Sequence, residues 1–227
     1  MATYVLVHGA WSGGYTWQGI ARSLRRAGHE VYTPTLTGLG ERAHLLRPDI
    51  NLDTHIADVT NLIRFEGLSD IVLVGHSYAG AVITGVADAM PEKIATLVYL
   101  DAFVPLNGQS IADLAPRRDA QPQQGPTIPP LPLSVFGTSP EKTERYADRR
   151  RPHPAACFSQ KIRLTGGIDR VKDRVYIYLN DPQPTTFTQF YEKYHAAPGW
   201  RSYTMPCTHL VQLDMPDELV RLLTSFA

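Results

Sequence analysis

The sequence of 227 residues has few cysteines, no net charge and no long apolar run. Its two cysteines, Cys157 and Cys207, are too few for a disulfide framework, and each is expected to be a small, partly buried side chain. Lys plus Arg number 22 and Asp plus Glu also number 22, which argues against nucleic acid or an anionic membrane as partner. The densest basic run, residues 149–151 (RRR), is predicted to be a solvated face, with a binding patch as the alternative.

Other absences narrow the class further. No segment approaches the roughly 20 consecutive apolar residues of a membrane span. Residues 1–7 (MATYVLV) lack a basic region and a cleavage site, so no secretory signal is expected and a cytoplasmic location is predicted. No His, Cys and Asp cluster has zinc-like spacing, and no Gly-rich loop precedes a basic residue, so neither metal nor cofactor is predicted.

What is present indicates one globular α/β domain over residues 1–227. Hydrophobic residues make up 43% and charged residues 19%, which is typical of a folded protein. Short β-branched runs alternate with helical periodicity, the pattern of a mainly parallel sheet flanked by helices. Strands are expected at residues 4–7, 30–32, 71–74, 94–100, 174–178 and 200–204. Helices are expected at about 17–28, from Asp53 or Thr54, at 77–90, from Ser139, at about 187–194, and from about Pro216.

Residues 106–170 interrupt this alternation. The segment is rich in proline and lies between the predicted strands that end at Leu100 and begin at Arg174. Long connections in compact domains tend to be functional, so we expect a lid or cap over a site. The alternative is a long surface loop without a catalytic role.

Residues 75–80 (GHSYAG) carry the strongest chemical signal. They follow an apolar strand and precede a predicted helix, so Ser77 is expected at a sharp turn that holds it out of the sheet near a helix N-terminus. Ala79 replaces the last glycine of the usual G-x-S-x-G pattern, so the match is to a relaxed form. We predict that Ser77 is a nucleophile. The alternative is a capping serine in an inert turn.

A second signal is residues 8–11 (HGAW) at the end of the first strand. Acyl transfer needs donors aimed at the developing oxyanion, and a glycine turn lets backbone N–H groups approach it. The Ala10 and Tyr78 N–H groups are assigned as that pair, with His8 expected to order the loop. Taken alone, this stretch would be an ordinary glycine turn. Trp11, Trp17 and Tyr78 are expected either to line a substrate pocket or to belong to the core.

His209 is the predicted general base for Ser77. It follows the last strand and precedes the final helix, so it reaches the same sheet edge on a different loop. His76 is expected to point away from the serine hydroxyl.

The acid of the triad has two candidates. Asp181 follows the strand at 174–178 and is favoured by the chain order Ser, Asp, His, whereas Asp101 ends the preceding strand. Either could instead be a turn or cap carboxylate.

Several of these segments resemble α/β-hydrolases. They are residues 5–11 (VLVHGAW), 75–80, 98–105 (VYLDAFVP) and the His209 segment through 216–219 (PDEL). The closest resemblance is to bacterial esterase relatives of plant methylesterases and hydroxynitrile lyases, from Thr3 to about Leu223, with the lid region matching loosely. Residues 179–182 are a residue shorter than the plant pattern.

The resemblance implies a serine hydrolase with an α/β-hydrolase fold that cleaves a small carboxylic ester, lactone or thioester through an acyl-enzyme. In this family the lyases tend to carry threonine at the position of Gly9 and lysine directly after the catalytic histidine, where this chain has Leu210. Hydrolysis is therefore expected, with a lyase or a ligand receptor of little turnover as alternatives. The expected partner is a small-molecule ester. The oligomeric state, a homodimer included, is left open.

Overall fold

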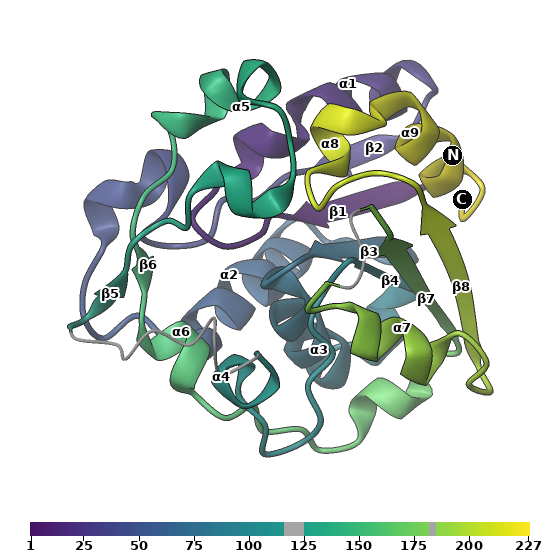
Figure 1. Ribbon diagram of the computed structural model, residues 1–227. Coiled ribbons are helices and arrows are strands. Elements are labelled where there is room, and N and C mark those ends of the chain that lie inside the picture. Colours follow the sequence, from purple (N-terminus) through teal and green to yellow (C-terminus); the bar gives the residue numbers. More distant parts are fainter. Residues whose placement is uncertain (116–124, 182–184) are drawn as a thin grey trace.

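The fold is built on a parallel β-sheet. The computed structural model describes residues 1–115, 125–181 and 185–227. Six parallel strands have the order β2-β1-β3-β4-β7-β8 (Figure 1). They are β1 (Thr3–Val7), β2 (Glu30–Tyr32), β3 (Ile71–His76), β4 (Ile94–Leu100), β7 (Asp173–Leu179) and β8 (Trp200–Met205). The predicted α/β class is confirmed, and the strands lie close to their expected positions.

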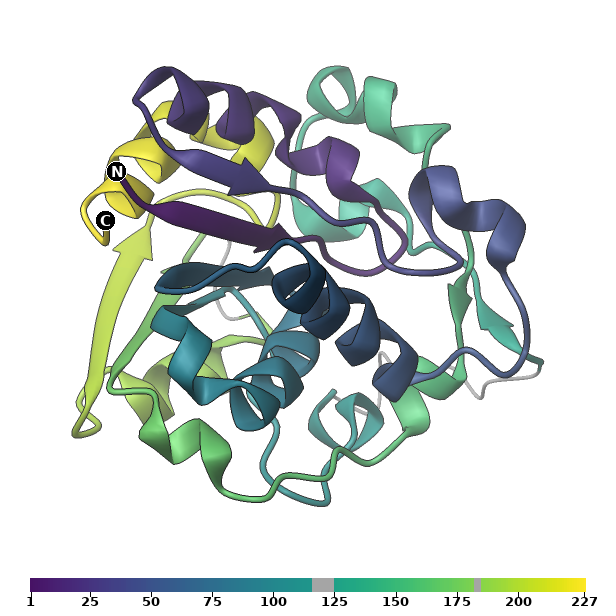
Figure 2. The ribbon, with the colours of Figure 1, turned by 180° about the vertical axis from the view of Figure 1, so that it is seen from behind.

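Helices cover both faces of this sheet, as Figures 1 and 2 show from opposite sides. One face packs α1 (Gln18–Arg26) and α9 (Pro216–Thr224), and the other packs α2 (Leu52–Phe65), α3 (Ala79–Ala89) and α7 (Thr188–Tyr194). Because alternate strand residues point to opposite faces, Tyr4 and Leu6 join the first core while Val5 and Val7 join the second. Every residue of β3 is therefore buried, which explains its continuous apolar sequence.

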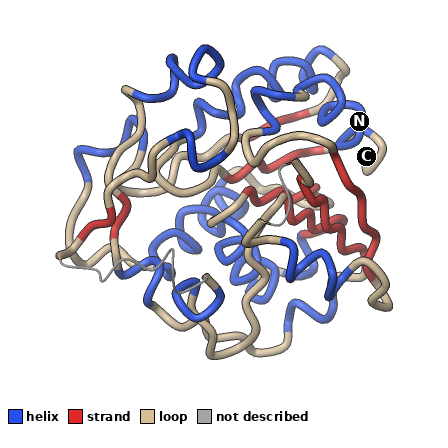
Figure 3. Tube along the Cα trace, in the orientation of Figure 1, coloured by secondary structure: helices blue, strands red, loops and turns tan. Residues whose placement is uncertain are grey.

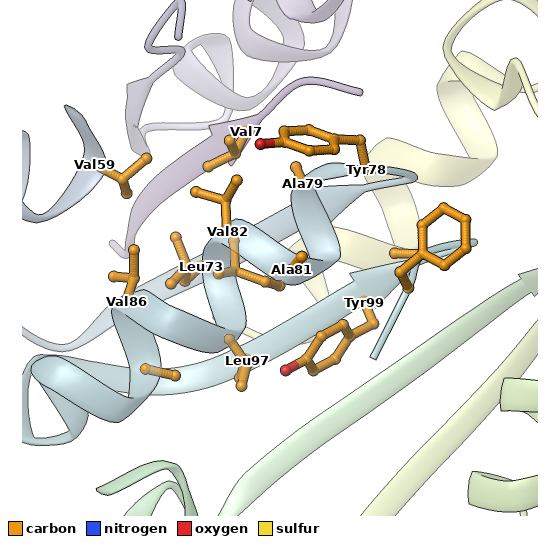
Figure 4. Packing of buried hydrophobic residues seen from close by; sticks show 14 of the residues in the cluster. Val7, Val59, Leu73, Tyr78, Ala79, Ala81, Val82, Val86, Leu97 and Tyr99 are labelled. Atoms are coloured by element: carbon orange, nitrogen blue, oxygen red, sulfur yellow. The ribbon is translucent and has the colours of Figure 1, made fainter. Parts of the chain in front are cut away.

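The packing of α3 positions the nucleophile turn. In Figure 4 its Val82 and Val86 lie against Leu73 of β3 and Leu97 of β4, with Val59 of α2 beside them. These side chains are fully buried, so the start of α3 is held firmly above the sheet. The strand-to-helix connection at Ser77 thus rests on a closely packed core.

Two helix starts differ from expectation. The helix predicted to be capped by Asp53 or Thr54 is capped by Asn51, whose side chain accepts a hydrogen bond from the Thr54 N–H at 3.1 Å. Thr54 Oγ1 in turn accepts from the Asn51 N–H at 3.3 Å, and this reciprocal capping box favours Asn51. The helix predicted from Ser77 begins at Ala79, because the Ser77 backbone is left-handed.

The segment 106–170 (the insert) forms small elements outside the main sheet. The strands β5 (Thr127–Ile128) and β6 (His153–Pro154) pair antiparallel and lie apart from the main sheet in Figure 3. Its helical pieces are α4 (Ile111–Leu114), η4 (Leu133–Phe136), α5 (Pro140–Ala147), α6 (Ala156–Ser159) and η5 (Gly167–Arg170). Residues 116–124 of the predicted lid lie outside the described residues. Its role as a lid stays a prediction.

The remaining elements are short. They are η1 (Gly14–Trp17), η2 (Gly40–Leu45), η3 (Pro91–Lys93) and α8 (Val211–Asp214). Both termini lie at the same end of the molecule (Figure 1). Within the described ranges, no helix combines the length and the apolar character needed to cross a membrane.

Gly80 provides a test of the packing that holds the nucleophile turn. A Cβ atom at this position would lie 2.0 Å from the carbonyl oxygen of Phe103, so Gly80→Ala must push α3 away from the end of β4. We expect a loss of roughly 1–3 kcal/mol in the free energy of unfolding, measured by urea denaturation. The control is Gly19→Ala in α1, where nothing lies within 4 Å, and it should stabilise by roughly 0.5–1 kcal/mol. Equal shifts for the two variants would contradict this packing.

Candidate active site

Ser77 lies at the turn between β3 and α3. Its φ is 58°, a left-handed conformation that is unusual for a residue with a side chain. The Ser77 N–H donates to the Leu100 carbonyl at 3.2 Å, and the Ser77 carbonyl accepts from the Phe103 N–H at 3.2 Å. These bonds to the end of β4 hold the strained turn in place, as predicted for a nucleophile elbow.

Glycines permit this turn to close. A Cβ at Gly75 would lie 2.8 Å from the Ala79 carbonyl oxygen, and one at Gly9 would lie 3.1 Å from the Ser77 Cβ. Ala79, the departure from the glycine pattern, is fully buried in the core. The relaxed motif therefore keeps its glycine at position 75, where a Cβ would meet the Ala79 backbone.

Free backbone donors come to the site from the loop after β1 and from the Ser77 turn. Within the described residues, the N–H groups of Ala10 and Tyr78 have no protein acceptor, as an oxyanion site requires. His8 orders this loop as expected, since its Nδ1–H donates to the Gly9 carbonyl at 2.8 Å and its Nε2 accepts from the Leu36 N–H at 3.1 Å. Burial lowers the pKa of His8 to about 4, which keeps the ring neutral.

His209 follows β8 and is enclosed by aromatic rings. Phe187 stacks on it at 4.9 Å between ring centroids and Phe136 at 5.3 Å. The Nε2–H of His76 donates to the His209 carbonyl at 2.8 Å, so His76 is engaged away from the serine hydroxyl, as predicted. Burial lowers the pKa of His209, which leaves the imidazole neutral and able to accept a proton.

Asp101, and not Asp181, is the partner of His209. The His209 Nδ1–H donates to Asp101 Oδ2 at 2.6 Å, and Asp101 Oδ1 accepts from the Leu179 N–H at 3.3 Å. Asp101 is fully buried, its φ is 42°, and burial raises the pKa of its carboxyl. Asp181 is exposed, and its N–H donates to the Cys207 carbonyl at 3.2 Å.

The prediction that Asp181 is the acid partner of His209 was therefore wrong. The His209 loop crosses the sheet toward β3 and β4, where its carbonyl accepts the His76 bond, and the imidazole meets the end of β4 and not that of β7. Asp181 lies at the end of β7, where its backbone is paired with the connection after β8. The signal for Asp101 was its position at the end of the strand beside the nucleophile strand.

A pocket opens beside these groups. Ser77 and His209 both line it, together with Ala10 and Trp11 of the loop after β1. Trp17 does not line it: its side chain is fully buried in the core between α1 and the sheet, so its prediction as a pocket residue was wrong. Tyr78 is also core, and its hydroxyl pairs with His55. A role for Trp11 in substrate binding stays a prediction.

The insert contacts the loop after β1 through Trp11. The Trp11 N–H donates to His153 Nδ1 at 3.3 Å, its carbonyl accepts from the Arg151 N–H at 3.1 Å, and its indole Nε1–H donates to the Ile128 carbonyl at 3.0 Å. Trp11 has a φ of 61°, so these bonds stabilise a strained backbone next to Ala10. Sequence reasoning missed His153, because nothing in the sequence places residue 153 beside residue 11.

One group of side chains has the composition of a metal site. Ligand atoms of His55, His153 and Cys157 all lie within 4.8 Å of one another. The His55 Nε2–H donates to the Thr37 carbonyl at 3.0 Å, so its Nδ1 accepts from the Tyr78 hydroxyl at 2.9 Å. His153 Nδ1 already accepts from Trp11, which places the proton of a neutral ring on Nε2. These hydrogen bonds occupy the lone pairs that a metal would need.

The cysteines are structural. Both Cys157 and Cys207 are buried and free, and burial raises the pKa of each thiol to about 12. A protonated, enclosed thiol is a poor nucleophile. Their expected burial is confirmed.

Comparison with known proteins identifies the family. The alpha/beta hydrolase family matches residues 4–222 of this chain. A carbendazim hydrolyzing esterase of Nocardioides sp. (strain SG-4G) is 42% identical over 240 aligned residues, which cover 99% of each chain. An alpha-hydroxynitrile lyase of Arabidopsis thaliana is 31% identical over 103 residues, 45% of this chain and 40% of the lyase.

Comparison with solved structures gives the same fold family. An extracellular alpha/beta-hydrolase from a Paenibacillus species, described as sharing structural and functional homology with tobacco salicylic acid binding protein 2, superposes with a TM-score of 0.85. It is 27% identical, and the match covers 100% of this chain and 99% of that one. This protein belongs to the α/β-hydrolase family. Its relatives confirm the predicted branch and the prediction of a carboxylic ester hydrolase.

Buried neutral histidines make stability depend on pH. Burial lowers the pKa of His8 and His55 to about 4 and that of His76 and His153 well below 6.5. Below pH 6.5 the unfolded chain therefore binds protons that the folded chain excludes. The free energy of unfolding should fall as pH drops from 6.5 to about 4, by roughly 1.4 kcal/mol per pH unit for each such histidine.

Urea denaturation across this range measures the effect. In His55→Gln, the slope of unfolding free energy against pH should correspond to about one proton fewer than in the wild type. His44→Gln is the matched control, because His44 is exposed, and it should leave the slope unchanged. An equal slope in His55→Gln and in the wild type would refute the conclusion that burial lowers the pKa of His55.

Proposed function

We propose that this protein is a serine esterase, in which Ser77 attacks the carbonyl carbon of a small carboxylic ester, lactone or thioester. The observation that carries the proposal is the 2.6 Å hydrogen bond between His209 and the buried Asp101, beside a pocket that Ser77 also lines. A nucleophile on a strained turn, a neutral imidazole and an orienting carboxylate form the arrangement that acyl transfer needs. The esterase relative that matches along the full chain supports the same class.

The tautomer of His209 suits a general base. Its Nδ1–H donates to Asp101, so the Nε2 atom carries the lone pair that accepts the Ser77 proton. As the serine oxygen bonds to the carbonyl carbon, the N–H groups of Ala10 and Tyr78 bind the oxyanion. Collapse of this intermediate breaks the ester bond, and the imidazolium of His209 protonates the leaving alcohol.

Hydrolysis of the acyl-enzyme repeats these roles with water. His209 takes a proton from the water, whose oxygen bonds to the acyl carbon, and returns that proton to Ser77 as the acid leaves. Asp101 stabilises the imidazolium in both halves of the reaction. Its bond to the Leu179 N–H fixes the orientation of the carboxylate.

The residue after His209 favours hydrolysis over cyanohydrin cleavage. Leu210 lines the pocket, where a lysine would supply the positive charge that stabilises departing cyanide. An apolar side chain cannot do so. The free, buried cysteines also fit the cytoplasmic location expected from the sequence.

Covalent labelling tests the nucleophile. A fluorophosphonate probe should label the wild type and fail to label Ser77→Ala, and hydrolysis of a chromogenic ester panel should fall by roughly 10⁴- to 10⁶-fold. Ser69→Ala is a control, because Ser69 is exposed and precedes β3, at the end of this strand opposite the Ser77 turn. Undiminished labelling of Ser77→Ala would remove this residue from its role.

Paired substitutions test the acid. Asp101→Asn should lower kcat by roughly 10⁴-fold, since an amide cannot hold the required tautomer or stabilise the imidazolium. Asp181→Asn removes an equal charge from an exposed side chain and should change kcat by less than about twofold. The decisive comparison is steady-state kcat on one ester, with thermal unfolding to confirm that both variants fold. The reverse order of effects would reinstate Asp181.

A further inference from the structure

Arg150 is a cation in the wall of the active-site pocket. It lies between α5 and β6, and its side chain lines the same pocket as Ser77 and His209. The sequence predicted a solvated face for residues 149–151, and for Arg150 this is wrong, because its side chain is only partly exposed. None of the ion pairs found in the described ranges includes Arg150.

The guanidinium group is held in place by three contacts. Its central carbon lies 5.7 Å from the Trp11 ring centroid and 5.8 Å from that of Phe136. One nitrogen, Nη1, donates to the Leu131 carbonyl at 2.5 Å. The edge formed by Nε and Nη2 has no protein acceptor within residues 1–115, 125–181 and 185–227. The Phe136 ring also stacks on His209, so the charge lies one aromatic ring away from the base.

A second donor at the same pocket is also unsatisfied. Tyr15 lines the pocket, and its hydroxyl is buried without a hydrogen-bond partner among the described residues. Unpaired buried donors are rare in proteins, and a half-buried cation without a counter-ion carries a desolvation cost. A flexible arginine could turn into water, but the contacts with Trp11, Phe136 and Leu131 retain it. Two unpaired donors of residues that line one pocket with Ser77 indicate a ligand that supplies acceptors.

We propose that Arg150, assisted by the Tyr15 hydroxyl, forms a carboxylate-binding subsite, and that the preferred substrates are esters that carry a second, free carboxylate group. A guanidinium edge matches the two oxygens of a carboxylate and binds them with paired hydrogen bonds. Such a half-ester would place its carboxylate against Arg150 and its ester carbonyl at Ser77. This inference rests on the proposed esterase function.

Matched esters test the subsite. Monomethyl terephthalate and methyl 4-methylbenzoate differ mainly in one charge, as do monomethyl adipate and methyl hexanoate. The wild type should have the higher kcat/KM for the anionic member of each pair, measured by methanol release. Arg150→Met should lower the anionic-to-neutral ratio of kcat/KM by roughly 10- to 100-fold, because a charge-assisted hydrogen bond is lost. Arg150→Lys should restore only part of the ratio, since ammonium lacks the paired edge.

Arg149→Met is the matched control. Arg149 is the neighbouring exposed arginine, which lies over the Tyr15 ring at 5.7 Å but does not line the pocket. It should leave the ratio within about twofold. A ratio unchanged in Arg150→Met, or a wild type that prefers the neutral esters, would overturn the subsite.

Benzoate binding separates failure of the subsite from failure of the esterase function. By calorimetry, benzoate should bind the wild type at least roughly 10-fold more tightly than Arg150→Met, and Ser77→Ala should retain the wild-type affinity. This measurement does not require turnover, so it holds even if no methyl ester is cleaved. Equal benzoate affinity in the wild type and in a folded Arg150→Met or Arg150→Lys variant would overturn the inference, whatever the esterase assays give.

Discussion

The backbone hydrogen bonds between the Ser77 turn and the end of β4 determine the geometry of the whole site. The Ser77 N–H is bound to Leu100 and its carbonyl to Phe103, on either side of Asp101. Both Ser77 and Asp101 are left-handed, at a cost of about 1–2 kcal/mol each for residues with side chains. Because the two strained turns share hydrogen bonds, each supports the other. Ser77 and Asp101 are therefore fixed on neighbouring strand ends, independently of His209, which follows β8.

Burial keeps the histidine rings of the site neutral, and their hydrogen bonds fix their tautomers. His209 lies between two phenylalanine rings, and the enclosed His8 orders the loop after β1 as a neutral ring. A neutral ring has one donor and one acceptor, so each hydrogen bond defines which nitrogen carries the proton. The same burial that sets these tautomers makes folding sensitive to acid. Acid sensitivity and catalytic orientation thus have one physical cause.

Local patterns were sufficient to predict much of this architecture. The six strands and the residues Ser77 and His209 followed from apolar periodicity and from a motif at a strand-to-helix turn. The acid partner of His209 could not be predicted in this way, because the choice between Asp101 and Asp181 depends on how the His209 loop crosses the sheet. That crossing brings the His209 carbonyl to His76, in a hydrogen bond between residues 133 positions apart.

Trp17 and Arg150 show that the sequence also does not predict which side chains of irregular segments face the pocket. Trp17 follows the glycine loop and was a reasonable pocket residue, yet the start of α1 turns it into the core. Arg150 belongs to a basic run that is typical of a solvated surface, yet the insert folds it against Trp11 and Phe136. Sequence spacing cannot predict which side of an irregular segment faces a pocket, because no regular period relates neighbouring side chains there.

The insert links the proposed carboxylate subsite to the loop after β1. Its residues Ile128, Arg151 and His153 hydrogen-bond to Trp11, and Arg150 lies over the same indole ring. A change in the insert that moves Arg150 must therefore also alter the support of the strained Trp11 backbone, one residue from the Ala10 N–H. This limits how the insert can vary. The charge of Arg150 can be altered by substitution of its side chain. The backbone contacts with Trp11 must be retained, because they keep the Ala10 N–H in its direction.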